Sequence, residues 1–171
     1  REIFFDNCRL PVERLLGSVG EGSAVLGAVS SVAVLGAAAA ATGVAQAAVD
    51  ATIKHLRERT ILDQPLAVNP AIQAHMARVA LDLGGARAWL DRGLAWLEGG
   101  AKGAPLPLWM TKVAVTKAAR RVVDHCLGLH GAAGYSRALS LERYYRDIRA
   151  FSIHWGNNDV LMDMVGKAVL A

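Results

Sequence analysis

Residues 22–49 read GSAVLGAVSSVAVLGAAAAATGVAQAAV and contain no charged side chain. An apolar run longer than about 18 residues raises the question of a transmembrane helix. This run is mostly Ala, Gly, Ser and Thr, which gain little free energy on transfer into lipid compared with Leu, Ile or Phe. No aromatic belt flanks it, and Glu21 and Asp50 stand at its ends without a basic cluster. The sequence therefore predicts no membrane span, but a helix buried on most faces inside a helical bundle.

The overall composition also favours helices. The chain has 171 residues, of which 53% are hydrophobic, 6% are aromatic and 31 are alanine. This apolar fraction excludes intrinsic disorder, and the length suits one domain or a piece of a larger protein. Alanine favours helix because it loses no side-chain entropy on ordering, whereas few aromatic residues remain to fill a sheet sandwich. The predicted fold class is all-α.

Charge and cysteine content exclude several other classes. The net charge is +4, but the 19 basic residues are scattered among 15 acidic ones, so no nucleic-acid partner is expected. Cys8 and Cys126 lie far apart and outside any metal-ligand spacing, which predicts neither a disulfide framework nor a metal site and fits the cytoplasm. The N-terminal residues lack a signal-peptide pattern, so we expect the chain to begin inside a longer protein.

The first part of the chain predicts a strand, a linker and a long helix. Residues 2–10 carry an apolar cluster that predicts a short strand, which Pro11 ends. We therefore assign residues 1–19 to a strand and linker, and residues 20–171 to a helical bundle. The first helix is expected to begin near Glu21 and to end near Arg59, with its uncharged first half enclosed and its second half exposed.

Three longer helices and a short one are expected to follow, which gives an up-and-down bundle of four longer helices plus one short helix. Asn69 and Pro70 provide the cap and first residue of a helix that runs to about Glu98. Pro105 and Pro107 open the next helix, which runs to about His130. Its water-facing positions are expected to be Lys112, Lys117, Arg120, Arg121 and Asp124. A short charged helix begins at Ser140, and an amphipathic helix through Val160, Met164 and Val169 ends the chain.

A glycine-containing turn and an arginine-rich segment are the main candidate motifs. The turn His130-Gly131-Ala132-Ala133-Gly134-Tyr135 is most simply a helix end, although its small residues would also admit a flat or phosphorylated ligand close to the backbone. Four arginines follow within thirteen residues, at positions 137, 143, 146 and 149. Such a face can bind phosphates, but solvated ion pairing is the commoner outcome.

Four segments in this order resemble the C-terminal helical domain of the acyl-CoA dehydrogenase superfamily of flavoproteins. They are residues 5–22, residues 59–66, the turn at residues 131–135 and the charged segment at residues 142–147. The family has Arg-x-x-Phe-Gly in the second segment and Gly-Gly-x-Gly-Tyr in the third. The resemblance covers nearly the whole chain and implies a domain that supplies one wall of a flavin and acyl site and the main subunit interface. It also implies that residues 1–19 are a strand remnant and linker from a missing β-domain.

The resemblance implies FAD as the cofactor and a set of residues that contact it. Arg59 matches an arginine that contacts the FAD of a neighbouring subunit, and a guanidinium suits a pyrophosphate because it offers a planar fork of donors. Gly131 and Ala132 match the Gly-Gly turn that approaches the same dinucleotide, while Leu62 with Asp63 replaces the family's Phe-Gly. Three further residues match flavin-contacting family positions. Gly128 replaces a Gln and Asn157 replaces a Thr, and Trp155 is the third.

The family's usual catalytic base is not found at either of its known positions. Dehydrogenation of a thioester needs a carboxylate that removes the α-proton while hydride moves to the flavin. Most relatives carry this Glu just before the Gly of a Glu-Gly-Thr segment, where this chain has Trp155. Other relatives place it on the first long helix, where this chain has Ala33, followed by Val34 in place of an Arg.

A branch of flavin-dependent monooxygenases in the same superfamily shares other features of the chain. Residues 69–73, Asn-Pro-Ala-Ile-Gln, resemble that branch's Asp-Pro-x-x-Gln segment. Arg146 and Arg149 followed by His154 resemble its Arg-x-x-Arg-Thr-His-x-x-His ending, in which the first His is Phe151 here. His154 is therefore a candidate catalytic residue that could deliver a proton near neutral pH, and a structural histidine is the alternative.

Three functions stay open at this point. The first is oxidation of an acyl thioester such as an acyl-CoA, with an unrecognised base. The second is flavin-dependent oxygenation. The third is a non-catalytic subunit that pairs with an active homologue. The expected assemblies are a homo-oligomer, either dimer or tetramer, or a hetero-oligomer with a homologous subunit.

Overall fold

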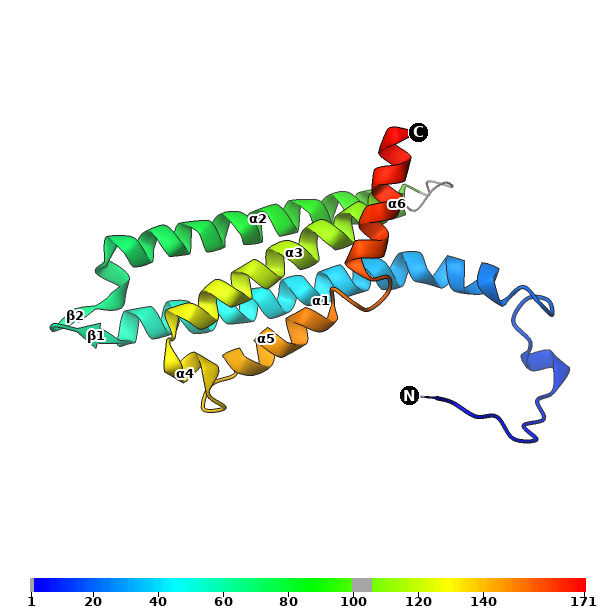
Figure 1. The fold of residues 1–171 in the computed structure, drawn as a ribbon, viewed down its shortest axis with the longest axis horizontal. Helices are drawn as coiled ribbons and strands as arrows, with labels where there is room; N and C mark the ends of the chain where they lie inside the picture. Colours follow the sequence, from blue (N-terminus) through cyan, green and yellow to red (C-terminus); the bar gives the residue numbers. More distant parts are fainter. Residues whose placement is uncertain (1, 100–105) are drawn as a thin grey trace.

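The computed structural model describes residues 2–99 and 106–171, and helices dominate it (Figure 1). The five longer elements are α1 (Gly22–Glu58), α2 (Pro70–Glu98), α3 (Leu106–Leu129), α5 (Leu141–Ala150) and α6 (Asn158–Leu170). The shorter ones are the helix α4 (Ala132–Tyr135), the 3₁₀ turns η1 (Val12–Arg14) and η2 (Leu66–Val68), and the strands β1 (Thr60–Ile61) and β2 (Gln64–Pro65). The predicted all-α class is confirmed.

Helix α3 lies at the centre of the bundle and contacts α1, α2, α5 and α6. The chain runs up and down through α1, α2, α3 and α5, and α5 lies along α1 and α3 (Figure 1). Helix α6 instead crosses the bundle near the C-terminal end of α5 and packs against α3 (Figure 1). The short helix α5 is thus the fourth aligned helix of the bundle, a place that the sequence predicts for a longer helix.

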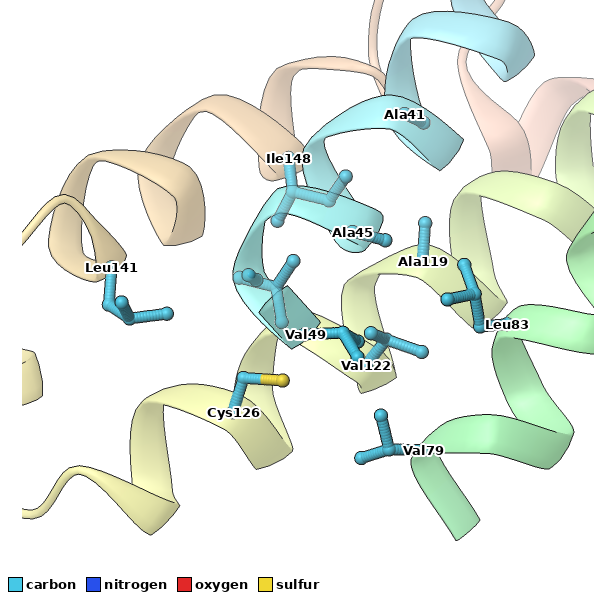
Figure 2. Packing of buried hydrophobic residues seen from close by; sticks show 12 residues of the cluster. Ala41, Ala45, Val49, Val79, Leu83, Ala119, Val122, Cys126, Leu141 and Ile148 are labelled. Carbon is cyan, nitrogen blue, oxygen red and sulfur yellow. The ribbon is translucent and has the colours of Figure 1, made fainter. Parts of the chain in front are cut away.

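Small side chains allow α1 and α3 to pack closely in the main core. Alanine at positions 41, 45 and 48 follows helical spacing and is fully buried against α3 (Figure 2). This cluster also contains larger apolar residues from all four aligned helices: Val49, Val79, Leu83, Val122, Val123, Leu141 and Ile148. The alanine-rich composition is therefore explained by close helix packing rather than by helix propensity alone.

The N-terminal part of α1 extends past the rest of the bundle. Its first buried residues are Val34 and Leu35, which pack near the C-terminal end of α2 and the beginning of α3. The twelve residues before Val34 span about 18 Å, and Leu26 among them is 65% exposed. The prediction of an enclosed first half and an exposed second half is wrong, because the C-terminal end of α2 and the start of α3 reach only to the level of Leu35. The buried positions of α1 therefore run from Val34 to Leu56.

The membrane question can be put to the same helix. By length and composition α1 could cross a membrane, since its most apolar window has a mean hydropathy of 2.0 and only 29% of that window is buried. A core helix of a soluble protein meets the same criteria. The buried contacts that begin at Val34 belong to the bundle core.

Two further expectations are corrected and one lies outside the described residues. Residues 2–10 form no strand in the described part of the chain, since they are exposed and have no neighbouring strand to satisfy their backbone groups. Lys112 does not face water but is completely buried. The expected helix start at Pro105 falls outside the described residues, whereas Asn69 caps α2 as predicted by accepting a hydrogen bond from Ala71 N at 2.9 Å.

Candidate functional site

Arg59 and Leu62 lie on a β-hairpin at one end of the bundle. Arg59 ends α1, and its backbone N–H donates to His55 O while its carbonyl accepts from Leu66 N, both at 2.8 Å. Thr60 then pairs with Pro65 and Ile61 with Gln64. The two central residues, Leu62 and Asp63, have φ values of +50° and +60°, as a two-residue hairpin turn of the primed type requires. Leu62 therefore projects from the bundle and is 92% exposed.

The glycine turn after α3 has two glycines with different physical roles. Gly131 has φ +58° and ψ −143°, a backbone conformation that is almost restricted to glycine. At Gly134 a Cβ atom would lie 2.7 Å from Leu127 O and 2.8 Å from His130 Cβ, so no side chain fits there. Gly131 and Ala132 remain exposed, so the helix-end interpretation is correct and still leaves backbone surface open to a ligand.

A histidine pair connects these two segments. The rings of His55, one turn before Arg59, and His130, directly before Gly131, stack with their centroids 4.3 Å apart. The Nδ1 atom of His130 lies 2.8 Å from Cys126 O, and His130 is buried. The pKa of His55 is lowered mainly by burial and further by the neighbouring His130. The stack holds the hairpin and the glycine turn at the same end of the bundle.

His154, Trp155 and Asn157 lie on the segment between α5 and α6. Trp155 has φ +51° and Gly156 has φ +98°, so the backbone reverses direction here. Asn157 caps α6, because its Oδ1 accepts from Asp159 N at 2.9 Å, and its amide NH₂ has no partner among the described residues. His154 is exposed, and its ring makes no hydrogen bond within the described part of the chain.

Sequence reasoning missed a polar cluster beneath this segment. Lys112 is 0% exposed, and its Nζ donates to Gly156 O at 2.5 Å and to Asn158 Oδ1 at 2.8 Å. Asn158 Nδ2 donates to Thr116 Oγ1 at 3.0 Å. Burial lowers the pKa of Lys112 to about 8. Helical spacing could have identified its position, because Lys112 lies four residues after Leu108 and three before Val115, both fully buried.

The candidate residues thus form two groups at opposite ends of α5. Arg59, Leu62, Gly128, Gly131 and Ala132 lie towards the hairpin end, and the second group follows the C-terminus of α5 (Figure 1). Ten helical residues span about 15 Å. A cavity of about 340 Å³ beside the histidine stack adjoins the first group, and one of about 220 Å³ lined by Lys117, Arg120 and Asn157 adjoins the second. Groups of three or more potential metal ligands are absent from the described residues.

Comparison with known proteins identifies a family for the chain. Residues 20–170 match the family described as "Acyl-CoA dehydrogenase, C-terminal domain". The chain is 31% identical to acryloyl-CoA reductase (NADH) of Anaerotignum propionicum over 99% of its own length and 43% of that protein. It is 32% identical to the mitochondrial short-chain specific acyl-CoA dehydrogenase of Mus musculus, over 92% of its length and 38% of that protein.

Solved structures give the same result. Butyryl-CoA dehydrogenase from Megasphaera elsdenii superposes with a TM-score of 0.88 at 25% identity, covering 95% of this chain and 42% of that one. The fold is that of the helical domain of this acyl-CoA dehydrogenase-type relative. The chain belongs to the acyl-CoA dehydrogenase family and matches its C-terminal domain, and it spans less than half the length of the curated relatives it matches.

Proposed function

We propose that this chain is the FAD-binding and oligomerisation domain of an acyl-CoA dehydrogenase-like oxidoreductase that acts on an acyl thioester. The observation that carries the proposal is the pair of donor-rich groups at the two ends of α5, in a chain of this family. The domain would belong to a longer cytoplasmic protein whose other portions complete the site.

The donors in both groups suit FAD. The Arg59 guanidinium is exposed at the end of α1 and offers charged, planar donors to a pyrophosphate. The open backbone at Gly131 and Ala132 permits a close approach, because a Cβ atom at Gly131 would meet nothing within 4 Å. At the other end, the Oδ1 atom of Asn157 accepts the cap bond of α6, while its amide NH₂ is available to donate to a flavin carbonyl.

The separation of the two groups supports an oligomer. One copy presents Arg59 and Gly131 at one end of α5 and Asn157 at the other, so a single copy does not gather them around one point. Two copies in opposite orientations would bring the Arg59 end of one against the Asn157 end of the other. We therefore propose that each dinucleotide lies at an interface between copies, in a dimer or tetramer, or beside a homologous subunit.

The source of the catalytic base is the open chemical question in this proposal. When bound, the flavin supplies a hydride acceptor, and a base must remove the substrate's α-proton. An indole at Trp155 and a methyl group at Ala33 cannot accept that proton. Val34 is buried and apolar, so it offers no positive charge to coenzyme A. Dehydrogenation by this protein would therefore require a base from another segment of the protein or from a partner subunit.

Flavin-dependent oxygenation is the alternative that one residue favours. His154 is exposed and directly precedes Trp155 and Gly156 in the sequence. An imidazole is a common general acid or base in catalysis, and oxygenation requires no α-carbon base. A non-catalytic subunit that pairs with an active homologue is the third possibility.

Anaerobic mixing of the purified full-length protein with acyl-CoA thioesters tests the proposal. Bleaching of the flavin absorbance supports thioester oxidation by this protein. Failure to bleach, combined with consumption of oxygen after reduction by a separate flavin reductase, would instead support the oxygenase. If neither occurs although FAD is bound, the non-catalytic subunit is supported, and a protein that takes up no FAD refutes the proposal.

A further inference from the structure

Lys112 is a buried cation without an acidic partner. Its side chain is 0% exposed, and it forms no ion pair among the residues that the structure describes. Burial of an ammonium without a counter-charge is costly unless hydrogen-bond acceptors surround it. Its two acceptors, Gly156 O and Asn158 Oδ1, both belong to the segment that leads into α6. The side chain thus connects the middle of the bundle to that segment alone.

The segment that Lys112 holds has an unusual backbone. Trp155 and Gly156 are consecutive residues with positive φ, and a Cβ atom at Gly156 would lie 3.0 Å from the Leu161 side chain. The carbonyl of Gly156 points inward to the ammonium, whereas the neighbouring side chains of Trp155 and Asn157 are exposed. A positive φ at a non-glycine residue such as Trp155 costs conformational energy, so the conformation persists only where surrounding contacts hold it. The ammonium is one of the contacts that fix it.

Other contacts of the polar cluster act on the same segment. Asn158 Nδ2 donates to Thr116 Oγ1, and the Thr116 hydroxyl donates to the Lys112 carbonyl at 2.8 Å. The backbone N–H of Asn158 donates to Ser152 O at 3.0 Å. No buried side-chain nitrogen or oxygen in the described ranges lacks a partner, so each polar atom of the cluster makes at least one hydrogen bond. Such a network defines a single position for residues 155–158.

We propose that Lys112 is a positioning residue that fixes the Gly156 carbonyl and thereby orients Trp155 and Asn157 towards the flavin. It touches neither substrate nor cofactor and acts through the backbone of residues 155–158. This inference rests on the proposed role of Asn157 in FAD binding. It also explains why a costly buried charge occupies this position.

The test compares Lys112→Met with a control in the full-length protein. Methionine retains most of the apolar stem and removes the ammonium. Lys167→Met is the matched control, because Lys167 lies on α6 but is exposed and pairs with Asp163. Hydrogen exchange of the FAD-free protein reports the order of residues 152–158, and a fluorescence titration with FAD reports the affinity. Asn158→Ala disturbs the same cluster from α6 and serves if Lys112→Met does not fold.

For Lys112→Met or Asn158→Ala we expect exchange in residues 152–158 to accelerate about tenfold, with α2 amides unchanged, and FAD affinity to fall about tenfold. The control should differ from the unmodified protein by less than about twofold in both measurements. Unchanged exchange in this segment overturns the positioning role. Faster exchange with unchanged FAD affinity also overturns the proposal, because the segment would then be held for another reason. An unmodified protein that binds no FAD refutes the proposed function instead, while the exchange experiment still reads the effect of Lys112.

Discussion

Substitution of Gly134 by alanine tests how tightly the glycine turn is packed against α3. The added Cβ atom would lie 2.7 Å from Leu127 O and 2.8 Å from His130 Cβ. Neither atom belongs to a flexible side-chain end, so α4 must move away from the last turn of α3. Overpacking of this kind costs about 1–3 kcal/mol. In a domain of this size, 1 kcal/mol lowers Tm by about 2–4 °C, so we expect a decrease of about 2–12 °C.

Gly84→Ala is the matched control for this substitution. Gly84 is exposed on α2, and a Cβ atom there would meet nothing within 4 Å. Alanine in a helix is favoured over glycine by about 0.5–1 kcal/mol, so this variant should melt at a slightly higher temperature. Thermal unfolding followed by circular dichroism measures both variants under identical conditions. If Gly134→Ala retains the Tm of the unmodified protein or raises it as the control does, α4 does not pack as closely against α3 as described.

Three further predictions concern the core and the charged groups. Ile148→Ala removes a fully buried α5 side chain from the main cluster and should lower the free energy of unfolding by about 2–5 kcal/mol in urea, whereas a loss below about 1 kcal/mol would contradict its burial. The folded-state pKa of Lys112, about 8, lies below its usual value of about 10.4, so the unfolded state binds more protons between these values and stability should rise with pH across this window. Urea titrations at several pH values should show that rise relative to Lys112→Met, and equal slopes would contradict it. Arg121 donates two hydrogen bonds to Asp82 and lowers the pKa of that carboxyl, so its stabilising contribution is present at neutral pH and lost as pH falls through the folded-state pKa. Because Arg121 is half exposed, Arg121→Met should cost less than about 1 kcal/mol at neutral pH, with a smaller difference in acid, and a larger cost in acid would refute this account.

Helix locations could be predicted because their signals are local. Asn69 and Pro70 indicate the start of α2, and the structure has both the helix start and the side-chain cap bond. The ends of α1 and α3 were expected within one residue of their observed positions, Glu58 and Leu129. Apolar spacing and capping residues determine these limits without reference to the rest of the chain.

Burial along α1 could not be predicted in the same way. The uncharged residues 22–49 indicate an apolar environment but not which neighbours provide it. In the structure the bundle contacts begin at Val34, because this is the level that the ends of α2 and α3 reach. The extent of burial on one helix therefore depends on the lengths of its neighbours, which the sequence of that helix does not contain.

The hairpin after α1 also lacked a recognisable signal. Two-residue hairpins usually carry Asn-Gly or Asp-Gly, whereas this chain has Leu62-Asp63 at the two positive-φ positions. The match of Arg59 to the family indicates where this segment lies in the sequence, but it does not indicate a two-residue hairpin. A Leu in this conformation is held by the two-residue pairing of β1 with β2.

The candidate site was predicted as a set of residues but not as two groups. Arg59, Gly131 and Asn157 were selected by resemblance, and nothing in their spacing shows that α5 separates them. Because lysine is usually exposed, the sequence predicts that Lys112 faces water, although its helical position is on the buried face of α3. Polar residues at buried positions are the places where composition alone gives the wrong answer.

The measurement that tests the central claim most directly is FAD binding by the full-length protein together with its molecular mass in solution. Our account predicts a yellow oligomer with about one FAD per chain, in which Arg59→Ala weakens FAD binding at least about tenfold through loss of a charged hydrogen-bond donor. A colourless monomer that remains colourless with added FAD would contradict the account.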